Sequence, residues 1–193
     1  MPDTAVRAHT KPDAFLSDVT TLRERARKSL DNGAVTPTYE GDKDKAIELL
    51  QNVLATEIVC VLRYTMHSIS VEGLSSQSVA EEFAEHAKDE RQHVMAAAER
   101  IDQLGGIPNF NPEGLASRSA TEYGQPGTLV EMVKQDLIAE RIAIDHYREL
   151  IRYFGDKDPT TRIMLEGFLA DEEDHATDMH DLLVSHEGRP FLD

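Results

Sequence analysis

The residues of this sequence best suited to chemistry lie in two copies of one short motif. Glu90-x-x-His93 and Glu172-x-x-His175 each follow an aspartate, and the two copies lie 82 residues apart. Residues three apart on a helix project from one face, so each Glu and His can hold one metal ion together. One such pair would carry little weight, because about 0.8 matches are expected by chance in a chain of this composition. The repetition makes the pattern informative.

Two further glutamates repeat nearly in step with these motifs. Glu57 and Glu140 are 83 residues apart, and a tyrosine follows each of them seven residues later, at Tyr64 and Tyr147. All four glutamates fall in the middle of helical stripes that are otherwise mostly apolar. An ionised carboxylate costs several kcal/mol in an apolar core unless opposite charge compensates it. No Lys or Arg occupies the same stripes, so the sequence favours bound cations over a bundle with buried ion pairs.

Four carboxylates and two imidazoles suit two divalent ions. The four negative charges balance the four positive charges of the metal pair, and the imidazoles complete the coordination. Mostly oxygen ligands with only two nitrogens favour iron or manganese over zinc. We therefore expect two iron ions, with manganese as the other possibility. The predicted ligands are Glu57, Glu90, His93, Glu140, Glu172 and His175.

Four long stretches of helical periodicity carry these residues. Ser78 with Glu81, and Thr128 with Glu131, have the spacing of capping boxes at helix starts. Gly residues mark the ends, because glycine readily adopts the left-handed conformation there. Each stretch spans roughly 27 residues, or about 40 Å. The predicted bounds are Asp42 or Asp44 to Gly73, the Ser75 to Ser78 cluster to just before Gly105, Thr128 to Gly155, and Asp158-Pro159 to the region of Gly188 and Pro190.

The connections between these helices predict the topology. The first and third connections are short and force antiparallel hairpins. Residues 105–127 are long enough to return along a whole helix. We expect an all-α four-helix bundle with one long crossover over residues 42–188, after an N-terminal arm (1–41) and before a short tail (189–193). The arm holds one short amphipathic helix from Asp18 to Leu30, which we expect to dock on the bundle or on a neighbouring subunit.

Composition excludes several classes of protein. The 193 residues carry a net charge of -16, which disfavours nucleic acid and anionic membranes as partners. The longest apolar run, from Ile58 to Leu62, is far too short to cross a bilayer. The single Cys60 cannot form an internal disulfide, and the sequence shows no signal peptide, so we expect a cytoplasmic protein. The basic residues of the arm, Arg23 to Lys28, are interrupted by an acidic one, and DNA binding is not expected.

Residues 43–186 resemble the bacterioferritin branch of the ferritin-like superfamily. The resemblance implies that Glu90 and Glu172 bridge two metal ions, that Glu57 and Glu140 are terminal ligands, and that Tyr64 can donate an electron to the centre. The motifs that carry the resemblance are Leu54-Ala55-Thr56-Glu57, Asp89-Glu90-x-x-His93, Leu137-Ile138-Ala139-Glu140, Asp171-Glu172-x-x-His175 and Leu104-Gly105-Gly106-Ile107-Pro108-Asn109.

The sequence also departs from that family. Bacterioferritins carry a haem-binding Met directly after the first motif's glutamate, where this chain has Arg91, so haem is not expected. Only seven residues follow His186, which we expect to be too few for the fifth helix of 24-subunit cages. The resemblance therefore favours a 12-subunit homo-oligomeric shell, related to the Dps proteins.

The implied function is that of a ferroxidase for iron storage and detoxification. Fe(II) would be oxidised to Fe(III) by O2 or H2O2 at a di-iron centre within each subunit. A rubrerythrin-like peroxidase or manganese catalase is the alternative, although the extra glutamate of rubrerythrins is Ala143 here and their Cys-rich module is absent. A di-iron oxygenase and a Dps-like, DNA-protecting shell are the other readings that the sequence leaves open.

The remaining histidines and the cysteine receive structural interpretations. We expect Cys60 to be a small apolar filler on a helix flank. The histidines off the central stripes are expected at the surface or at subunit interfaces, where some could bind iron in transit. They are His67, His86, His146, His180 and His186.

Overall fold

The computed structural model describes residues 16–28, 30–72 and 76–187. The chain separates into two compact units, residues 1–38 and residues 39–193, which are described one at a time. The predicted C-terminal tail (189–193) and the first 15 residues of the predicted arm lie outside the described residues.

The N-terminal unit contains the short helix α1 (Val19–Ala26), followed by a 3-10 turn (Leu30–Asn32). Asp18 begins α1 by accepting hydrogen bonds from two backbone amides of the first turn. The prediction of one helix from Asp18 to Leu30 is wrong in length, because α1 ends at Ala26. None of the residues of α1 is buried. Too few apolar contacts hold a third turn together in so short a helix.

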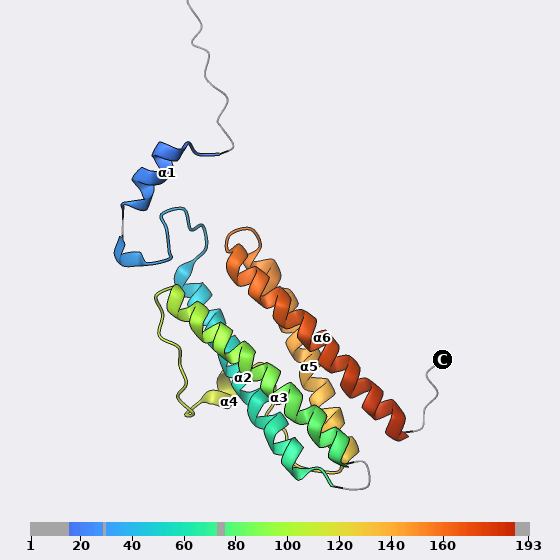
Figure 1. The fold of residues 1–193 in the computed structure, drawn as a ribbon. Helices are drawn as coiled ribbons and strands as arrows, with labels where there is room; N and C mark the ends of the chain where they lie inside the picture. The colour runs from blue at the N-terminus through green and yellow to red at the C-terminus, as the bar shows by residue number, and fades with distance from the viewer. Residues whose placement is uncertain (1–15, 29, 73–75, 188–193) are drawn as a thin grey trace, which may run out of the picture. The chain divides into compact units, whose positions relative to one another are not determined.

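The second unit is a four-helix bundle with one long crossover, as predicted (Figure 1). α2 packs along α3 and α5 along α6, and the two hairpins meet through α2 with α5 and α3 with α6. Because each short loop reverses the chain, the partners within each hairpin are antiparallel. No strand occurs in the described residues. The four helices are α2 (Lys43–Ser70), α3 (Ser76–Gln103), α5 (Leu129–Phe154) and α6 (Pro159–Glu187).

Capping interactions set the helix ends at most of the predicted positions. The side chain of Asp42 accepts from the amide of the third residue of α2. Thr128 and Glu131 form the predicted capping box at the start of α5, and Gly155 ends α5 with a positive φ of 45°. The predicted capping box at Ser78 is wrong: α3 begins within the predicted cluster but two residues earlier, which places Ser78 inside the helix.

The crossover runs from the end of α3 to the start of α5 and contains the four-residue helix α4 (Leu115–Arg118). Gln51 of α2 fastens it by donating to the carbonyl of Ile107 and accepting from the amide of Asn109. Gly106 passes so close to α2 and α3 that a Cβ there would lie 2.9 Å from the side chains of Ile47 and Ile101. The crossover thus lies against the first hairpin, where only glycine fits at this point.

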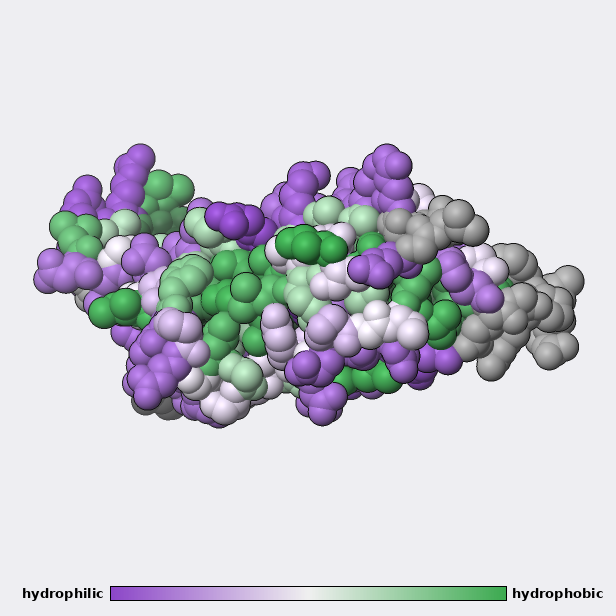
Figure 2. All heavy atoms as spheres, turned by 90° about the horizontal axis from the view of Figure 1, so that it is seen from below, coloured by the Kyte–Doolittle hydropathy of each residue, from purple (hydrophilic) through white to green (hydrophobic). Residues whose placement is uncertain are grey.

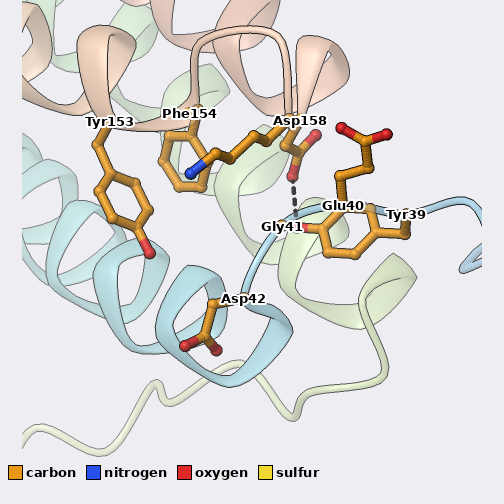
Figure 3. Close-up of a pocket in the computed structure, with 8 residues that line it drawn as sticks. Tyr39, Glu40, Gly41, Asp42, Tyr153, Phe154 and Asp158 are labelled. Atoms are coloured by element: carbon orange, nitrogen blue, oxygen red, sulfur yellow. Dashed lines mark hydrogen bonds between the residues drawn. The ribbon is translucent and has the colours of Figure 1, made fainter.

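A network of polar side chains joins the α5–α6 turn to the start of α2. Asp158 is buried, and its carboxylate caps α6 at Thr161 and accepts from Arg100 of α3 at 2.8 Å. Figure 3 shows the hydroxyl of Tyr39 donating to the same carboxylate, at 3.0 Å, beside a cavity lined by Tyr153 and Phe154. One carboxylate therefore connects three parts of the bundle at this end.

Replacing Asp158 tests how much this network stabilises the bundle. Asp158→Asn leaves the partly buried Arg100 without its ionic partner and weakens the cap, so the free energy of unfolding should fall by about 3 kcal/mol, as measured by urea denaturation. Asp156→Asn, two residues away, removes a fully exposed carboxylate paired with Arg162 and should leave the midpoint unchanged. Equal midpoints for the two variants would refute this role of Asp158.

Candidate metal centre

The six residues predicted as ligands lie together in the middle of the bundle, and all six are buried. They form two overlapping groups whose ligand atoms lie within 4.8 Å of one another. Both groups contain Glu90 and Glu172. The first group adds Glu57 of α2 and His93 of α3, and the second adds Glu140 of α5 and His175 of α6. Each helix of the bundle thus contributes to the cluster.

Each of the two shared glutamates places one oxygen near His93 and the other oxygen near His175. His93 Nδ1 lies 3.4 Å from Glu90 Oε2 and 3.5 Å from Glu172 Oε1. His175 Nδ1 lies 3.6 Å from Glu90 Oε1 and 3.5 Å from Glu172 Oε2. Glu57 Oε2 lies 3.4 Å from His93 Nδ1. Two carboxylates that divide their oxygens in this way are placed to bridge two ions, which is the arrangement that the sequence resemblance implied.

Most of the polar atoms that face the centre have no hydrogen-bond partner among the described residues. They include both oxygens of Glu57 and of Glu90, one oxygen of Glu140 and of Glu172, and Nδ1 of both histidines. Buried polar groups without partners are rare because each costs a desolvation penalty. Oxygen and imidazole donors that converge without protein partners fit a pair of divalent ions.

Burial and the repulsion between carboxylates change the proton affinity of Glu57 and Glu140. Burial, followed by the charge of Glu90, raises the pKa of Glu57 well above its ordinary value. Burial and the charge of Glu172 likewise raise the pKa of Glu140. In the chain without metal, these two carboxyls therefore keep protons that free carboxyls would lose.

The pKa values of the two histidines are raised although burial opposes their protonation. Burial alone would lower the pKa of His175, but contact with Glu172 and Glu90 raises it to about 10. Burial also opposes protonation of His93, and contacts with Glu172, Glu57 and Glu90 outweigh it, so that its pKa is raised. Protons therefore supply the compensating positive charge when no metal does so.

The aspartates of the two motifs reach across to the opposite hairpin. Asp171 Oδ2 lies 3.0 Å from Nε2 of His93, while Asp89 Oδ2 lies 4.0 Å from Nε2 of His175. Both histidines thus turn Nδ1 toward the centre and Nε2 toward an aspartate. A carboxylate behind a ligating histidine fixes the ring and raises its basicity. The sequence showed that the aspartates repeat, and in the structure Asp171 is within hydrogen-bonding distance of His93, whereas Asp89 is farther from His175.

Tyr64 contacts the centre directly. Its hydroxyl donates to Glu140 Oε1 at 2.5 Å, and its ring is fully buried. The two repeated tyrosines differ in this respect, because the buried hydroxyl of Tyr147 has no hydrogen-bond partner among the described residues. The second half of the centre, at Glu140, is therefore the half connected to a redox-active side chain.

Contrary to the sequence interpretation, one cation does reach one of the four glutamates, Glu140. Arg63 is fully buried beside Tyr64, and its Nη2 lies 3.8 Å from Glu140 Oε1. Its stronger partner is the buried Asp136, at 2.8 Å, which also contacts His67 Nδ1 at 2.8 Å. Sequence analysis missed Arg63 because it projects from the flank of the stripe. Asp136 lies four residues before Glu140, on the same helical face, and that spacing was a readable signal.

Two histidines expected at the surface or at interfaces are buried inside the chain. His67 joins the network of Arg63, and His86 stacks on His175 with ring centroids 4.0 Å apart. The prediction was wrong for both because it considered the face of one helix and not the neighbouring helix. Cys60 is buried, with Sγ 3.4 Å from Arg63 Nη2, and belongs to neither four-residue group. His180 and His186 are exposed, and His146 is partly buried.

Comparison with known proteins agrees with this geometry. The model of the ferritin-like domain family matches residues 47–187, which include all six residues. The chain belongs to the ferritin-like family. It is 31% identical over 137 residues to the bacterioferritin of Mycobacterium leprae, covering 70% of this chain and 81% of that protein. It is 30% identical over 152 residues to a DNA protection during starvation protein of Pyrococcus furiosus, covering 77% of this chain and 80% of that protein.

Solved structures place this ferritin-like chain in the same part of the family. A dodecameric thioferritin, described as the bacterioferritin-related protein of Bacteroides fragilis, superposes with a TM-score of 0.74 and 31% identity. The match covers 80% of this chain and 94% of that structure. The chain is thus a bacterioferritin-like and Dps-like member of the ferritin-like family.

Metal uptake by this ferritin-like centre should release protons. The raised pKa values favour protons on Glu57, Glu140, His93 and His175 in the chain without metal, and each proton must leave before its atom can bind metal. Zn(II) titrated anaerobically at pH 7 in weak buffer should release protons as the pair of ions binds. Because protons compete with metal, affinity should fall as the pH is lowered. Binding without proton release, or affinity independent of pH, would contradict these pKa shifts.

Proposed function

We propose that this protein is a ferroxidase that oxidises two Fe(II) ions at the buried centre. The observation that carries the proposal is the pair of four-residue groups sharing Glu90 and Glu172. In this proposal Glu57 and His93 complete one iron site, and Glu140 and His175 complete the other. Both ions are substrates here, and an oxygen-rich donor set accommodates Fe(II) and Fe(III).

The reaction balances with the oxidants that the proposal names. Two Fe(II) ions lose one electron each, and O2 accepts the two electrons with two protons to form H2O2. With H2O2 as the oxidant, two electrons and two protons form two molecules of water. The buried position of the centre limits access of water to the iron, while the shared carboxylates hold both ions at one place.

Tyr64 and the aspartates take supporting roles in this proposal. Tyr64 touches the ligand Glu140 and can supply an electron when only one iron is oxidised. Asp171 is a positioning residue, because it hydrogen-bonds the outer nitrogen of His93, and Asp89 faces the outer nitrogen of His175 at 4.0 Å. The groove beside them, about 610 Å³, is lined by both histidines and both aspartates and gives the centre contact with solvent.

We further propose storage of the Fe(III) product in a homo-oligomeric shell of 12 subunits. The related Bacteroides fragilis structure is dodecameric by its description. Figure 2 shows hydrophobic surface gathered along the middle of one face, between hydrophilic margins, and exposed apolar surface of this kind marks subunit contacts. The exposed large apolar side chains of the bundle helices are Leu62, Ile69, Met95, Ile138, Tyr153 and Ile163.

Among the described residues, none of the helices combines the length and the apolar character of a membrane span.

Iron oxidation measured on matched variants tests the ferroxidase. The wild-type chain should bind about two Fe(II) ions tightly without oxygen and form Fe(III) rapidly on admission of air, followed by absorbance. Glu90→Gln removes a shared oxygen ligand and should slow oxidation by at least about a hundredfold. Glu99→Gln, on an exposed position of the same helix, is the control and should oxidise iron at the wild-type rate. Unchanged oxidation in Glu90→Gln would overturn the proposed function.

A further inference from the structure

A third group of metal-binding side chains lies next to the proposed di-iron centre. Glu82 and His86 occupy successive turns of α3, and Asp178 lies one turn beyond His175 on α6. Each offers one ligand atom, and the three atoms lie within 4.8 Å of one another. None of the three residues belongs to the six described above.

The spacing within this group suits an ion better than hydrogen bonds. His86 Nε2 lies 3.5 Å from Glu82 Oε1 and 3.5 Å from Asp178 Oδ2. An N–H···O hydrogen bond is shorter, about 2.9 Å. Ligand atoms at about 2.1 Å from one tetrahedral ion lie about 3.4 Å apart. The His86 side chain is 3% exposed, and its Nδ1 has no hydrogen-bond partner among the described residues. A buried imidazole therefore faces two carboxylates at the separation that metal ligands adopt.

Charge and donor type indicate which ions would bind. Within the described part of the chain, no Lys or Arg forms a salt bridge with Glu82 or Asp178. Two carboxylates and one imidazole favour Fe(II), Mn(II), Co(II) or Zn(II), whereas Ca²⁺ and Mg²⁺ prefer sets of oxygen ligands. Three protein ligands leave coordination positions for water, so the ion can exchange.

The group also connects solvent to the buried centre. The side chains of Glu82 and Asp178 are 41% and 50% exposed, whereas His86 is buried behind them. The His86 ring stacks on His175 at 4.0 Å and meets the edge of the Tyr64 ring at 5.2 Å. An ion held by this group would thus sit one side chain away from the proposed iron ligands.

We propose that Glu82, His86 and Asp178 form a third divalent-cation site, at which Fe(II) exchanges between solvent and the central pair. The proposal of a binding site rests only on the geometry of these three residues. Its role in supplying Fe(II) rests on the proposed function, so the two parts need separate measurements.

Counting bound Zn(II) tests the site without any iron chemistry. In equilibrium dialysis without oxygen, the wild-type chain should bind three Zn(II) ions and the double variant Glu82→Gln with Asp178→Asn should bind two. Both substituted side chains are half exposed, so the bundle should stay folded, which circular dichroism checks. Glu85→Gln with Asp181→Asn changes the charge equally at exposed positions on the same two helices and should leave three ions. Two ions in the wild type, or three in the double variant, would refute the site.

Initial rates of Fe(III) formation test the supply role. At limiting Fe(II), the double variant should oxidise iron about tenfold more slowly than the control pair, and saturating Fe(II) should restore the rate. Equal rates at limiting Fe(II) would refute the supply role. A further comparison keeps the two proposals apart: Glu90→Gln should lose Zn(II) from the centre and retain the ion at Glu82, His86 and Asp178. If Glu90→Gln loses oxidation while the wild type binds only two ions, the ferroxidase stands and the third site falls.

Discussion

Burial of four carboxylates at one level of an apolar bundle is the constraint on which the structure depends. Glu57, Glu90, Glu140 and Glu172 cannot all be ionised there without positive charge close by, because their repulsion acts in a medium of low polarity. The raised pKa values of Glu57 and Glu140 show how protons relieve this repulsion in the chain without metal. Two divalent ions would replace those protons and give every unpartnered oxygen a partner.

The rest of the bundle maintains this arrangement asymmetrically. The two hairpins repeat the four glutamates and two histidines nearly in step, yet among the described residues only Glu140 has a tyrosine and an arginine beside it. Arg63 forms its shorter ion pair with Asp136. The charge of Asp136 therefore offsets most of the attraction between Arg63 and Glu140. In the described part of the chain, the half of the centre at Glu57 has no such neighbours, and neither oxygen of Glu57 has a hydrogen-bond partner there. The two proposed metal positions therefore have chemically different surroundings, despite the repeated motifs.

Much of this could be predicted from sequence because it depends on local periodicity. A Glu and a His three residues apart share a helical face in any helix, and side chains such as Asp42 and Thr128 cap helices through local contacts. The positions of His86 and Arg63 depend on which helix lies opposite, and one helical stripe does not contain that information. The length of the short arm helix was overestimated because amphipathic spacing alone does not supply the contacts that stabilise another turn.

Diffraction from a crystal soaked in Mn(II), recorded at an X-ray wavelength where manganese scatters anomalously, tests the central claim most directly. The account predicts two strong peaks inside the bundle, both in contact with Glu90 and Glu172, one also near Glu57 and the other also near Glu140. An interior without such peaks, with these glutamate side chains turned outward or paired with protein cations, would contradict it.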